Sequence, residues 1–247
     1  MTAGTRDRAD KVLTAQGIFD SRAKAQAAIA AGLVRADGVV VARPSDMIAA
    51  DAVIEAQPAY PYVSRGGVKL EAGLDAFAID PAGRVCLDIG ASTGGFTEVL
   101  LGRGAARVYA VDVGHGQLHP SIAGDPRVVT LEGTDARRLT RAHIPEQAEL
   151  LVADVSFISL KLVLPTVIPL LAAKAELVAL IKPQFEAGRA HVAKGIVRDA
   201  AVHARVCDEI AGLVQGLGFA VLGIIPSPIA GGDGNREFLI GARRGAI

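Results

Sequence analysis

The sequence predicts an α/β protein with an open, mostly parallel β-sheet, preceded by a small α+β domain. Two observations carry this prediction. Beyond about residue 64, short apolar segments typical of strands alternate with helical stretches, which is the signature of a parallel sheet covered by helices. Before that point, prolines and tyrosines gather in AQPAYPYV, a composition break that suits a non-helical linker. We therefore expect a small domain over 1–55, a linker over 56–63 and a larger domain over 64–247.

The small domain reads as two short helices followed by short strands. Turns are expected at Gly17 and Gly32, and Ser21 is expected to cap a helix that begins at Arg22. The alternation around Asp37-Gly38 predicts a β-hairpin, because this dipeptide adopts the tight turns that hairpins require.

The larger domain contains seven strand candidates, of which the last two are expected to pair as a hairpin across a long loop rich in glycine and proline. The apolar stretch 162–181 is not a membrane span, because it contains two prolines, a lysine and a glutamate. It reads as a helix and then a buried strand. The strand candidates are 85–90, 106–113, 127–133, 149–155, 175–182, 219–225 and 237–242.

Composition restricts the class of protein. The formal net charge is zero, with 26 basic and 26 acidic side chains, so any contact with nucleic acid must come from a local basic patch. Cys86 and Cys207 lie far apart in sequence, which argues against a disulfide framework or a zinc site and suits a reducing cytoplasm. The charged start MTAGTRDRADKVL does not resemble a signal peptide.

A glycine-rich turn follows the first strand of the larger domain. It spans 88–96 with the letters DIGASTGGF, and its glycines allow the backbone to approach a ligand closely. A dinucleotide fingerprint needs G-x-G-x-x-G, which the serine at position 92 breaks. The pattern D-x-G-x-x-x-G-G resembles that of class I, Rossmann-like methyltransferases, in which this loop holds the methionine part of S-adenosylmethionine. The resemblance implies cofactor contacts from Asp88, Gly90, Ala91, Ser92, Gly94, Gly95 and Phe96.

Acidic residues follow the next strands at positions suited to a nucleoside. Asp112 ends its strand 22 residues after Gly90, where a carboxylate can accept hydrogen bonds from both ribose hydroxyls. Asp135 follows the third strand and could bind the adenine amino group or could cap a helix. The predicted cofactor contacts beyond the glycine turn are Asp112, Val113, Asp135, Ala136 and Asp154.

Four ionisable residues lie where an apolar core does not ordinarily keep them: Lys69, Asp154, Lys182 and Glu237. Asp154 and Lys182 end the fourth and fifth strands, at the sheet edge where ligands bind. Methylating a hydroxyl group requires removal of its proton, which a neutral Lys182 could perform. Burial and a second ammonium favour neutral Lys182, whereas the carboxylates favour its charged form. Each residue alone could form an ordinary ion pair, but the set of four indicates catalysis without a metal.

An ordered series of motifs runs through the larger domain. The segments are SRGGVKLEAGLDAF, CLDIGASTGGFTEVLL, VYAVDVGHGQL, ADVSFISL, LIKPQFEAGR and KGIVRDAAVH. Together they resemble the TlyA (haemolysin A) family of rRNA 2′-O-methyltransferases, and the resemblance extends over about residues 6–241. The catalytic domain of that family is similar to FtsJ-type ribose methyltransferases, whose Lys-Asp-Lys-Glu tetrad matches the four residues above. The resemblance implies cytidine targets in small-subunit rRNA, large-subunit rRNA or both.

The amino-terminal segment is similar to a small RNA-binding domain shared with a small-subunit ribosomal protein and pseudouridine synthases. The similarity implies that polar side chains of this segment meet phosphates, which would anchor and orient the enzyme on ribosomal RNA. An ordinary charged surface is the alternative. The residues expected to contact RNA are Arg6, Arg8, Lys11, Ser21, Arg22, Lys24 and Arg65.

Two departures from the family pattern and two rival functions stay open at this point. Asp37 stands where the hairpin of such domains usually has Asn, and Asp135 stands where the adenine motif often has Asn. The name haemolysin implies a membrane-active cytolysin, against which the lack of an unbroken apolar span argues. A non-catalytic ribosome-assembly factor is the other rival, and the retained tetrad argues against it.

Overall fold

The computed structural model describes residues 5–232 and 234–245. The chain divides into two compact units, Met1–Pro61 and Tyr62–Ile247, and the division falls inside the predicted linker 56–63. Each unit has its own hydrophobic core.

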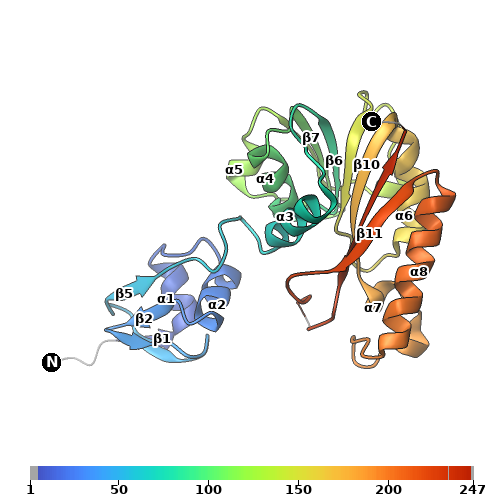
Figure 1. Ribbon diagram of the computed structural model, residues 1–247. Coiled ribbons are helices and arrows are strands. Elements are labelled where there is room, and N and C mark those ends of the chain that lie inside the picture. The colour runs from blue at the N-terminus through green and yellow to red at the C-terminus, as the bar shows by residue number, and fades with distance from the viewer. Residues whose placement is uncertain (1–4, 233, 246–247) are drawn as a thin grey trace. The chain divides into compact units, whose positions relative to one another are not determined.

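The first unit packs two helices against short strands (Figure 1). The Oγ of Ser21 caps α2 by accepting a hydrogen bond from the backbone N–H of Lys24 at 3.3 Å, as predicted. Asp37 and Gly38 both have positive φ, +50° and +77°, which a two-residue hairpin turn between β2 and β3 requires. The helices are α1 (Ala9–Ala15) and α2 (Arg22–Ala30), and the strands are β1 (Arg6–Arg8), β2 (Val34–Ala36), β3 (Val39–Val40), β4 (Met47–Ala49) and β5 (Ile54–Ala56).

The second unit is built on a seven-stranded sheet in the order β11-β12-β10-β9-β6-β7-β8. Neighbouring strands are parallel except where β12 pairs with β10 and β11. Each of the seven predicted segments forms one of these strands, and the last two pair as expected. The strands are β6 (Val85–Ile89), β7 (Arg107–Val111), β8 (Val128–Leu131), β9 (Ala148–Ala153), β10 (Leu171–Ile181), β11 (Ala220–Pro226) and β12 (Phe238–Arg244).

Helices cover both faces of this sheet (Figure 1). Successive residues of a strand point to opposite faces, so Val178 joins the core beneath α3 and α4 while Ala179 joins the core beneath α6 and α8. The helices are α3 (Gly66–Phe77), α4 (Gly95–Gly102), α5 (Pro120–Ala123), α6 (Leu160–Val167), α7 (Pro183–Glu186) and α8 (Ala200–Gly216), with 3₁₀ turns η1 (Ala136–Arg138), η2 (Ile168–Leu170) and η3 (Arg189–His191).

The strand order creates a crevice at one place. From β6 the chain proceeds outward through β7 and β8, and β9 then returns to the other side of β6. At such a reversal the connections leave the carboxyl ends of the two central strands in opposite directions, which opens a crevice for a ligand. The site described below lies at this edge.

The apolar stretch 162–181 folds as predicted, since α6 and the short turn η2 lead into β10. Within residues 5–232 and 234–245, no helix has the length and apolar character needed to cross a bilayer.

Candidate active site

The glycine turn between β6 and α4 approaches the neighbouring strand so closely that a side chain cannot be accommodated. Gly90 has φ +86°, and a Cβ built on it would lie 2.4 Å from the main-chain oxygen of Asp154. Gly94 has φ +95°, again in the region that favours glycine. The turn therefore depends on both glycines, and it exposes backbone at the carboxyl end of β6.

Asp112 links this turn to the next loop. Its Oδ2 accepts a hydrogen bond from the backbone N–H of Ser92 and its Oδ1 accepts one from that of Gly114, each at 2.8 Å. The carboxylate borders a cavity of about 420 Å³ that we call the glycine-loop cavity. Its lining residues are Ile89, Gly90, Ser92, Val111, Asp112, Val113, Gly114, Gln117, Thr134, Asp135, Ala136, Asp154, Val155, Ser156, Phe157, Ile158 and Val163.

Asp135 forms the predicted cap and also borders the cavity. Its side chain caps η1 by accepting from the backbone N–H of Arg137 at 2.9 Å, and it also lines the glycine-loop cavity. Hydrogen bonds from the Arg137 side chain lower the pKa of Asp135 to about 2, so the group is an ionised acceptor at neutral pH.

Asp88 lies beneath the turn and does not line the cavities on either side of it. It is fully buried, and its Oδ2 accepts a hydrogen bond from Thr97 Oγ1 at 2.6 Å while its Oδ1 has no partner. Burial raises the pKa of Asp88 to about 7. Gly94, another predicted cofactor contact, is likewise absent from the lining of both cavities and lies against Leu118 and Ile122.

The four residues of the predicted tetrad lie around one cavity. Lys69 Nζ donates to Glu237 Oε2 at 2.6 Å, and Lys182 Nζ lies 2.5 Å from Asp154 Oδ1. Lys182 also donates to the hydroxyl of Ser156 at 2.8 Å. The two lysines and Glu237 are buried, so neither ammonium is left without a carboxylate partner.

Strand register explains how distant residues meet here. Asp154 and Lys182 directly follow the parallel neighbours β9 and β10, so both lie at the same edge of the sheet. Glu237 directly precedes β12, whose Phe238 is opposite Ile181 in an antiparallel pair. Helix α3 packs on β10 and β12, and it brings Lys69 to Glu237.

This tetrad cavity has a volume of about 320 Å³ and shares five lining residues with the glycine-loop cavity: Gly90, Ser92, Asp154, Ser156 and Phe157. Ala91, Gly95 and Phe96, three further predicted cofactor contacts, line it instead of the glycine-loop cavity. The complete lining is Ser64, Arg65, Gly66, Lys69, Gly90, Ala91, Ser92, Thr93, Gly95, Phe96, Asp154, Ser156, Phe157, Lys182, Gln184, Phe185, Gly232 and Glu237.

Several lining residues were missed by the sequence reasoning. Ser156 and Gln184 each lie two residues beyond a tetrad residue that ends a strand, and this spacing was the available signal. Gln117 lines the glycine-loop cavity from a loop whose backbone N–H groups bind the Glu132 carboxylate, an anchor that no local pattern revealed.

The predicted RNA contacts of the first unit are held by partners within that unit. Arg8 and Arg22 both bind the fully buried carboxylate of Asp10, at 3.0 and 2.7 Å. Lys11 and Lys24 pair with acids one turn away along the chain, and Arg6 donates to a main-chain oxygen at 2.6 Å. Each guanidinium has five N–H donors, so these contacts leave donors for a phosphate.

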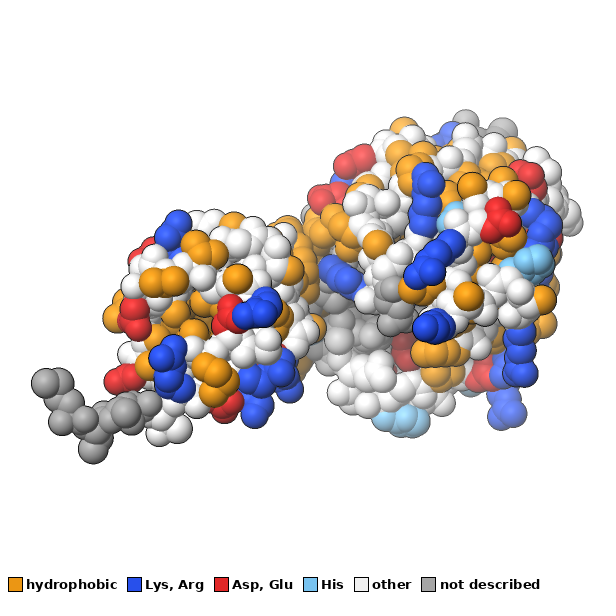
Figure 2. All heavy atoms as spheres, turned by 90° about the horizontal axis from the view of Figure 1, so that it is seen from below, with side chains coloured by type: hydrophobic (Ala, Val, Ile, Leu, Met, Phe, Trp, Pro, Cys, Tyr) orange, Lys and Arg blue, Asp and Glu red, His pale blue; other side chains and the backbone are white. Residues whose placement is uncertain are grey.

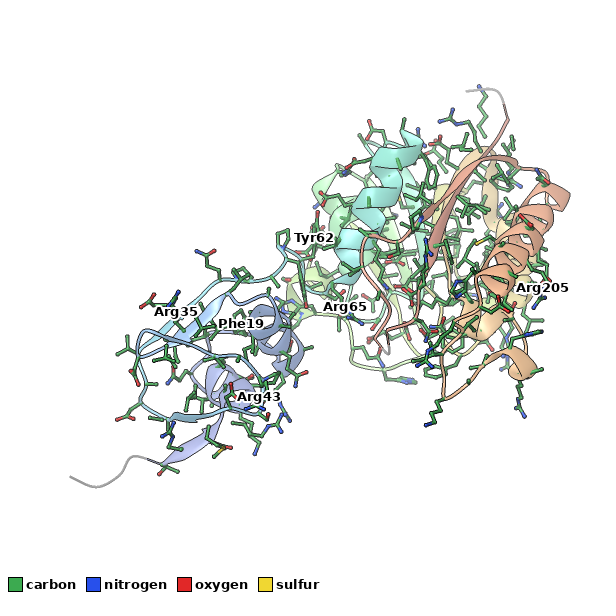
Figure 3. All side chains as sticks on the ribbon, turned by 60° about the horizontal axis from the view of Figure 1, so that its bottom comes forward. Phe19, Arg35, Arg43, Tyr62, Arg65 and Arg205 are labelled. Atoms are coloured by element: carbon green, nitrogen blue, oxygen red, sulfur yellow. The ribbon has the colours of Figure 1, made fainter. Side chains whose placement is uncertain are left out.

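Arg65 belongs to the second unit. It directly precedes α3, close to Tyr62 in the segment that enters this helix (Figure 3), and it lines the tetrad cavity.

Each of the two units matches a known protein family. Residues 62–244 match the family model of the FtsJ-like methyltransferases, and residues 7–54 match that of the S4 domain. The chain is 47% identical over 243 residues to the 16S/23S rRNA (cytidine-2′-O)-methyltransferase TlyA of Mycobacterium tuberculosis, a match that covers 96% of this chain and 90% of that protein.

Two further relatives have names of another kind. Hemolysin A of Brachyspira hyodysenteriae is 40% identical over 234 residues, which cover 94% of this chain and 98% of that protein. Among solved structures, a protein from Streptococcus thermophilus that is named as a hemolysin has a TM-score of 0.78 at 39% identity, covering 98% of this chain and 90% of that chain. The chain belongs to the TlyA branch of the FtsJ-like methyltransferase family and carries an S4 domain at residues 7–54.

Proposed function

We propose that this protein transfers a methyl group from S-adenosylmethionine to the ribose 2′-hydroxyl of a cytidine in ribosomal RNA. One observation carries the proposal: Lys69, Asp154, Lys182 and Glu237 surround a single cavity that adjoins the glycine-loop cavity and shares Asp154 with it. The TlyA relative from Mycobacterium tuberculosis, whose name states this activity on cytidine, supports the choice of substrate.

The glycine-loop cavity suits a nucleoside cofactor with a charged amino-acid tail. Gly90 lines it without a side chain, close against the main chain of Asp154, and the carboxylates of Asp112 and Asp135 also line it. In our proposal Asp112 binds the ribose hydroxyls and Asp135 lies on the adenine side, with Val113 and Ala136 beside it. When bound, S-adenosylmethionine supplies an electrophilic methyl group.

The tetrad would hold and deprotonate the substrate hydroxyl. Asp154 and Ser156 fix the Lys182 amine where the two cavities meet. We assign to Lys182, in its neutral form, the hydrogen bond to the 2′-hydroxyl and the removal of its proton. The ammonium that results pairs with Asp154, and Lys69 and Glu237 position the ribose. Holding the hydroxyl in line contributes to the rate as well as proton transfer does, because an oriented pair of reactants has already lost the entropy of encounter.

The rival reading as a cytolysin has no support in the part of the chain that the structure describes, where no helix could span a membrane. The rival reading as a non-catalytic assembly factor leaves the paired and buried tetrad without a role, because a buried ion pair gives little or no stability compared with apolar packing.

The test compares Lys182→Ala with Lys174→Ala, which removes an exposed lysine from β10, the strand that Lys182 follows. Each protein is incubated with labelled S-adenosylmethionine and with purified small or large ribosomal subunits, and the methylated position is mapped. We expect Lys182→Ala to lower the rate by about 100-fold or more, the usual contribution of a general base. Calorimetry should show unchanged cofactor binding.

Two results would contradict the proposal. If the unmodified protein labels neither subunit, the proposed RNA methyltransferase activity is wrong. If Lys182→Ala reacts at a rate close to that of Lys174→Ala, the activity stands and the role assigned to Lys182 is wrong.

A further inference from the structure

A third cavity opens beside the tetrad cavity. It has a volume of about 860 Å³ and shares Ser156, Phe157, Gln184 and Phe185 with the tetrad cavity. At its other end it shares Val113, Asp135 and Ile158 with the glycine-loop cavity. The phenyl rings of Phe157 and Phe185 lie 5.2 Å apart between centroids, and Phe157 is 91% exposed. We call this space the phenylalanine cavity. Its wide apolar walls are of the kind against which a planar heterocycle can pack.

Gln184, which lines this cavity, carries a polar atom that lacks a partner. The side-chain oxygen of Gln184 is shielded from solvent and accepts no hydrogen bond. Such an unmet acceptor costs free energy, and a donor brought by a ligand would recover it. Gln184 belongs to α7 and stands two residues after Lys182, so its position relative to the tetrad is fixed by a short, partly buried segment.

The chemistry of the proposed reaction determines what can occupy the phenylalanine cavity. When the 2′-oxygen lies at Lys182, the base is attached to the adjacent ribose carbon and must enter a space that adjoins the tetrad cavity. One such space is the glycine-loop cavity, which the cofactor takes. The phenylalanine cavity adjoins the tetrad cavity at Gln184 and Phe185, neither of which lines the glycine-loop cavity, so this end is open to the base.

Cytosine and uracil differ at the edge that would face Gln184. Cytosine carries an amino group at position 4, a donor, whereas uracil carries a carbonyl oxygen there, an acceptor. A side-chain carbonyl oxygen accepts a hydrogen bond from the cytosine amino group and repels the uracil oxygen. The last side-chain torsion of a glutamine is broad, so a small turn of Gln184 would present its oxygen to the cavity.

We propose that the side-chain oxygen of Gln184 accepts a hydrogen bond from the 4-amino group of the target cytosine and makes the enzyme prefer cytidine to uridine. This inference rests on the proposed function and adds the residue that selects the base. Uracil could be accommodated only if the Gln184 amide turned over to present its NH₂ group.

The experiment uses the full chain and ribosomal subunits that carry either cytidine or uridine at the mapped position. Gln184→Met keeps the length of the side chain and loses the acceptor. Gln184→Glu keeps the acceptor and cannot present a donor. Gln215→Met is the matched control, because Gln215 is an exposed residue near the end of α8.

We expect the unmodified protein and Gln215→Met to methylate cytidine roughly tenfold faster than uridine, the scale of one base-edge hydrogen bond. Gln184→Met should lose most of this ratio through slower methylation of cytidine. Gln184→Glu should keep cytidine as substrate and show an equal or larger ratio. Cofactor affinity, measured by calorimetry, checks that each variant is folded.

The outcomes separate this inference from the function beneath it. If the unmodified protein methylates neither RNA, the proposed function is wrong. Methylation with equal rates on cytidine and uridine, or a cytidine preference that Gln184→Met leaves unchanged, would overturn the role of Gln184 alone. Equal loss on both bases in both Gln184 variants, with cofactor binding intact, would also overturn it, because Gln184 would then act on the reaction and not on the choice of base.

Discussion

A buried charge at a strand does not by itself mark an active site. Glu176 of β10 is as buried as any residue of the tetrad, and it forms ion pairs with Arg84 and Arg243. Its position in the strand distinguishes it from Lys182. Glu176 pairs with Leu150 near the start of β9, whereas Lys182 follows the carboxyl end of β10 at the edge where ligands bind. Position along the strand therefore separates a structural ion pair from a candidate catalytic one.

Asp88 gives a prediction about stability and pH. Its pKa rises from about 4 in an unfolded chain to about 7 when buried, so the folded state holds a proton that the unfolded state loses. The free energy of unfolding should therefore fall as the pH rises from about 4 to about 7. Between pH 5 and pH 8 we expect a loss of about 3 kcal/mol relative to Asp88→Asn, which does not titrate.

Urea unfolding of the unmodified protein and of the Asp88→Asn variant at pH 5, 6, 7 and 8 would measure this difference. Parallel pH dependences for the two proteins would show that the carboxyl group does not change its protonation on folding. Asp80→Asn is a suitable control, since Asp80 is exposed and makes a single local hydrogen bond to the backbone N–H of Ala82.

At the scale of elements, the alternation of apolar segments was sufficient to predict the sheet. Each predicted strand is present, and the strand-end rule alone put Asp154 and Lys182 at one edge. The predicted start of β10 was wrong by several residues. Leu171 pairs with Ala148 across a register shift, and this pairing extends the strand through an alanine-rich segment with no strand signal of its own.

The pairing of Lys69 with Glu237 could not be read from local patterns. It depends on β12 inserting between β10 and β11, and a sheet order of this kind is a property of the packed molecule. Strand β1 of the first unit was also missed, because its three residues form a strand only by pairing with β4, some forty positions away. Gln184 escaped because the strand-end rule was applied to ionisable side chains alone.

The loop after β7 shows how one carboxylate can organise part of a cavity. Glu132 accepts hydrogen bonds from the backbone N–H groups of Gly116, Gln117 and Leu118 at 2.9, 2.7 and 3.0 Å. These bonds lower the pKa of Glu132, and the bond from Leu118 contributes most. The stabilisation is thus present above the pKa of an unfolded glutamate and is lost as the pH falls through the lowered value.

We expect Glu132→Gln to weaken cofactor binding by about three- to tenfold at pH 7, because the amide offers one acceptor where the carboxylate offers two, without charge. The rate at saturating cofactor should stay unchanged, which calorimetry and steady-state kinetics would show together. Glu55→Gln, an exposed change in β5, serves as control. A fall in the saturated rate with unaltered affinity would assign Glu132 a different role.

At the scale of the whole molecule, the net charge of zero restricts how RNA can be bound. Residues 1–61 contain seven basic and seven acidic side chains, so the S4 unit has no net charge. Figure 2 shows basic and acidic side chains interspersed on the visible face of this unit. Attraction at long range is therefore weak, and binding must depend on a few basic groups in correct positions.

This view predicts a modest but measurable dependence of RNA affinity on salt. In the full chain, the triple change Arg6→Ala, Lys11→Ala and Lys24→Ala removes three of the predicted phosphate contacts and spares Arg8 and Arg22, which stabilise the buried Asp10. Each lost contact should reduce the slope of log affinity against log salt by about one. Filter binding to ribosomal subunits over a range of salt concentrations measures the slope.

Arg43→Ala, a change at an exposed arginine of the same unit outside the predicted set, should leave the slope unaltered. A slope that the triple change does not alter would mean that these residues form an ordinary charged surface, and that RNA is held elsewhere on the molecule.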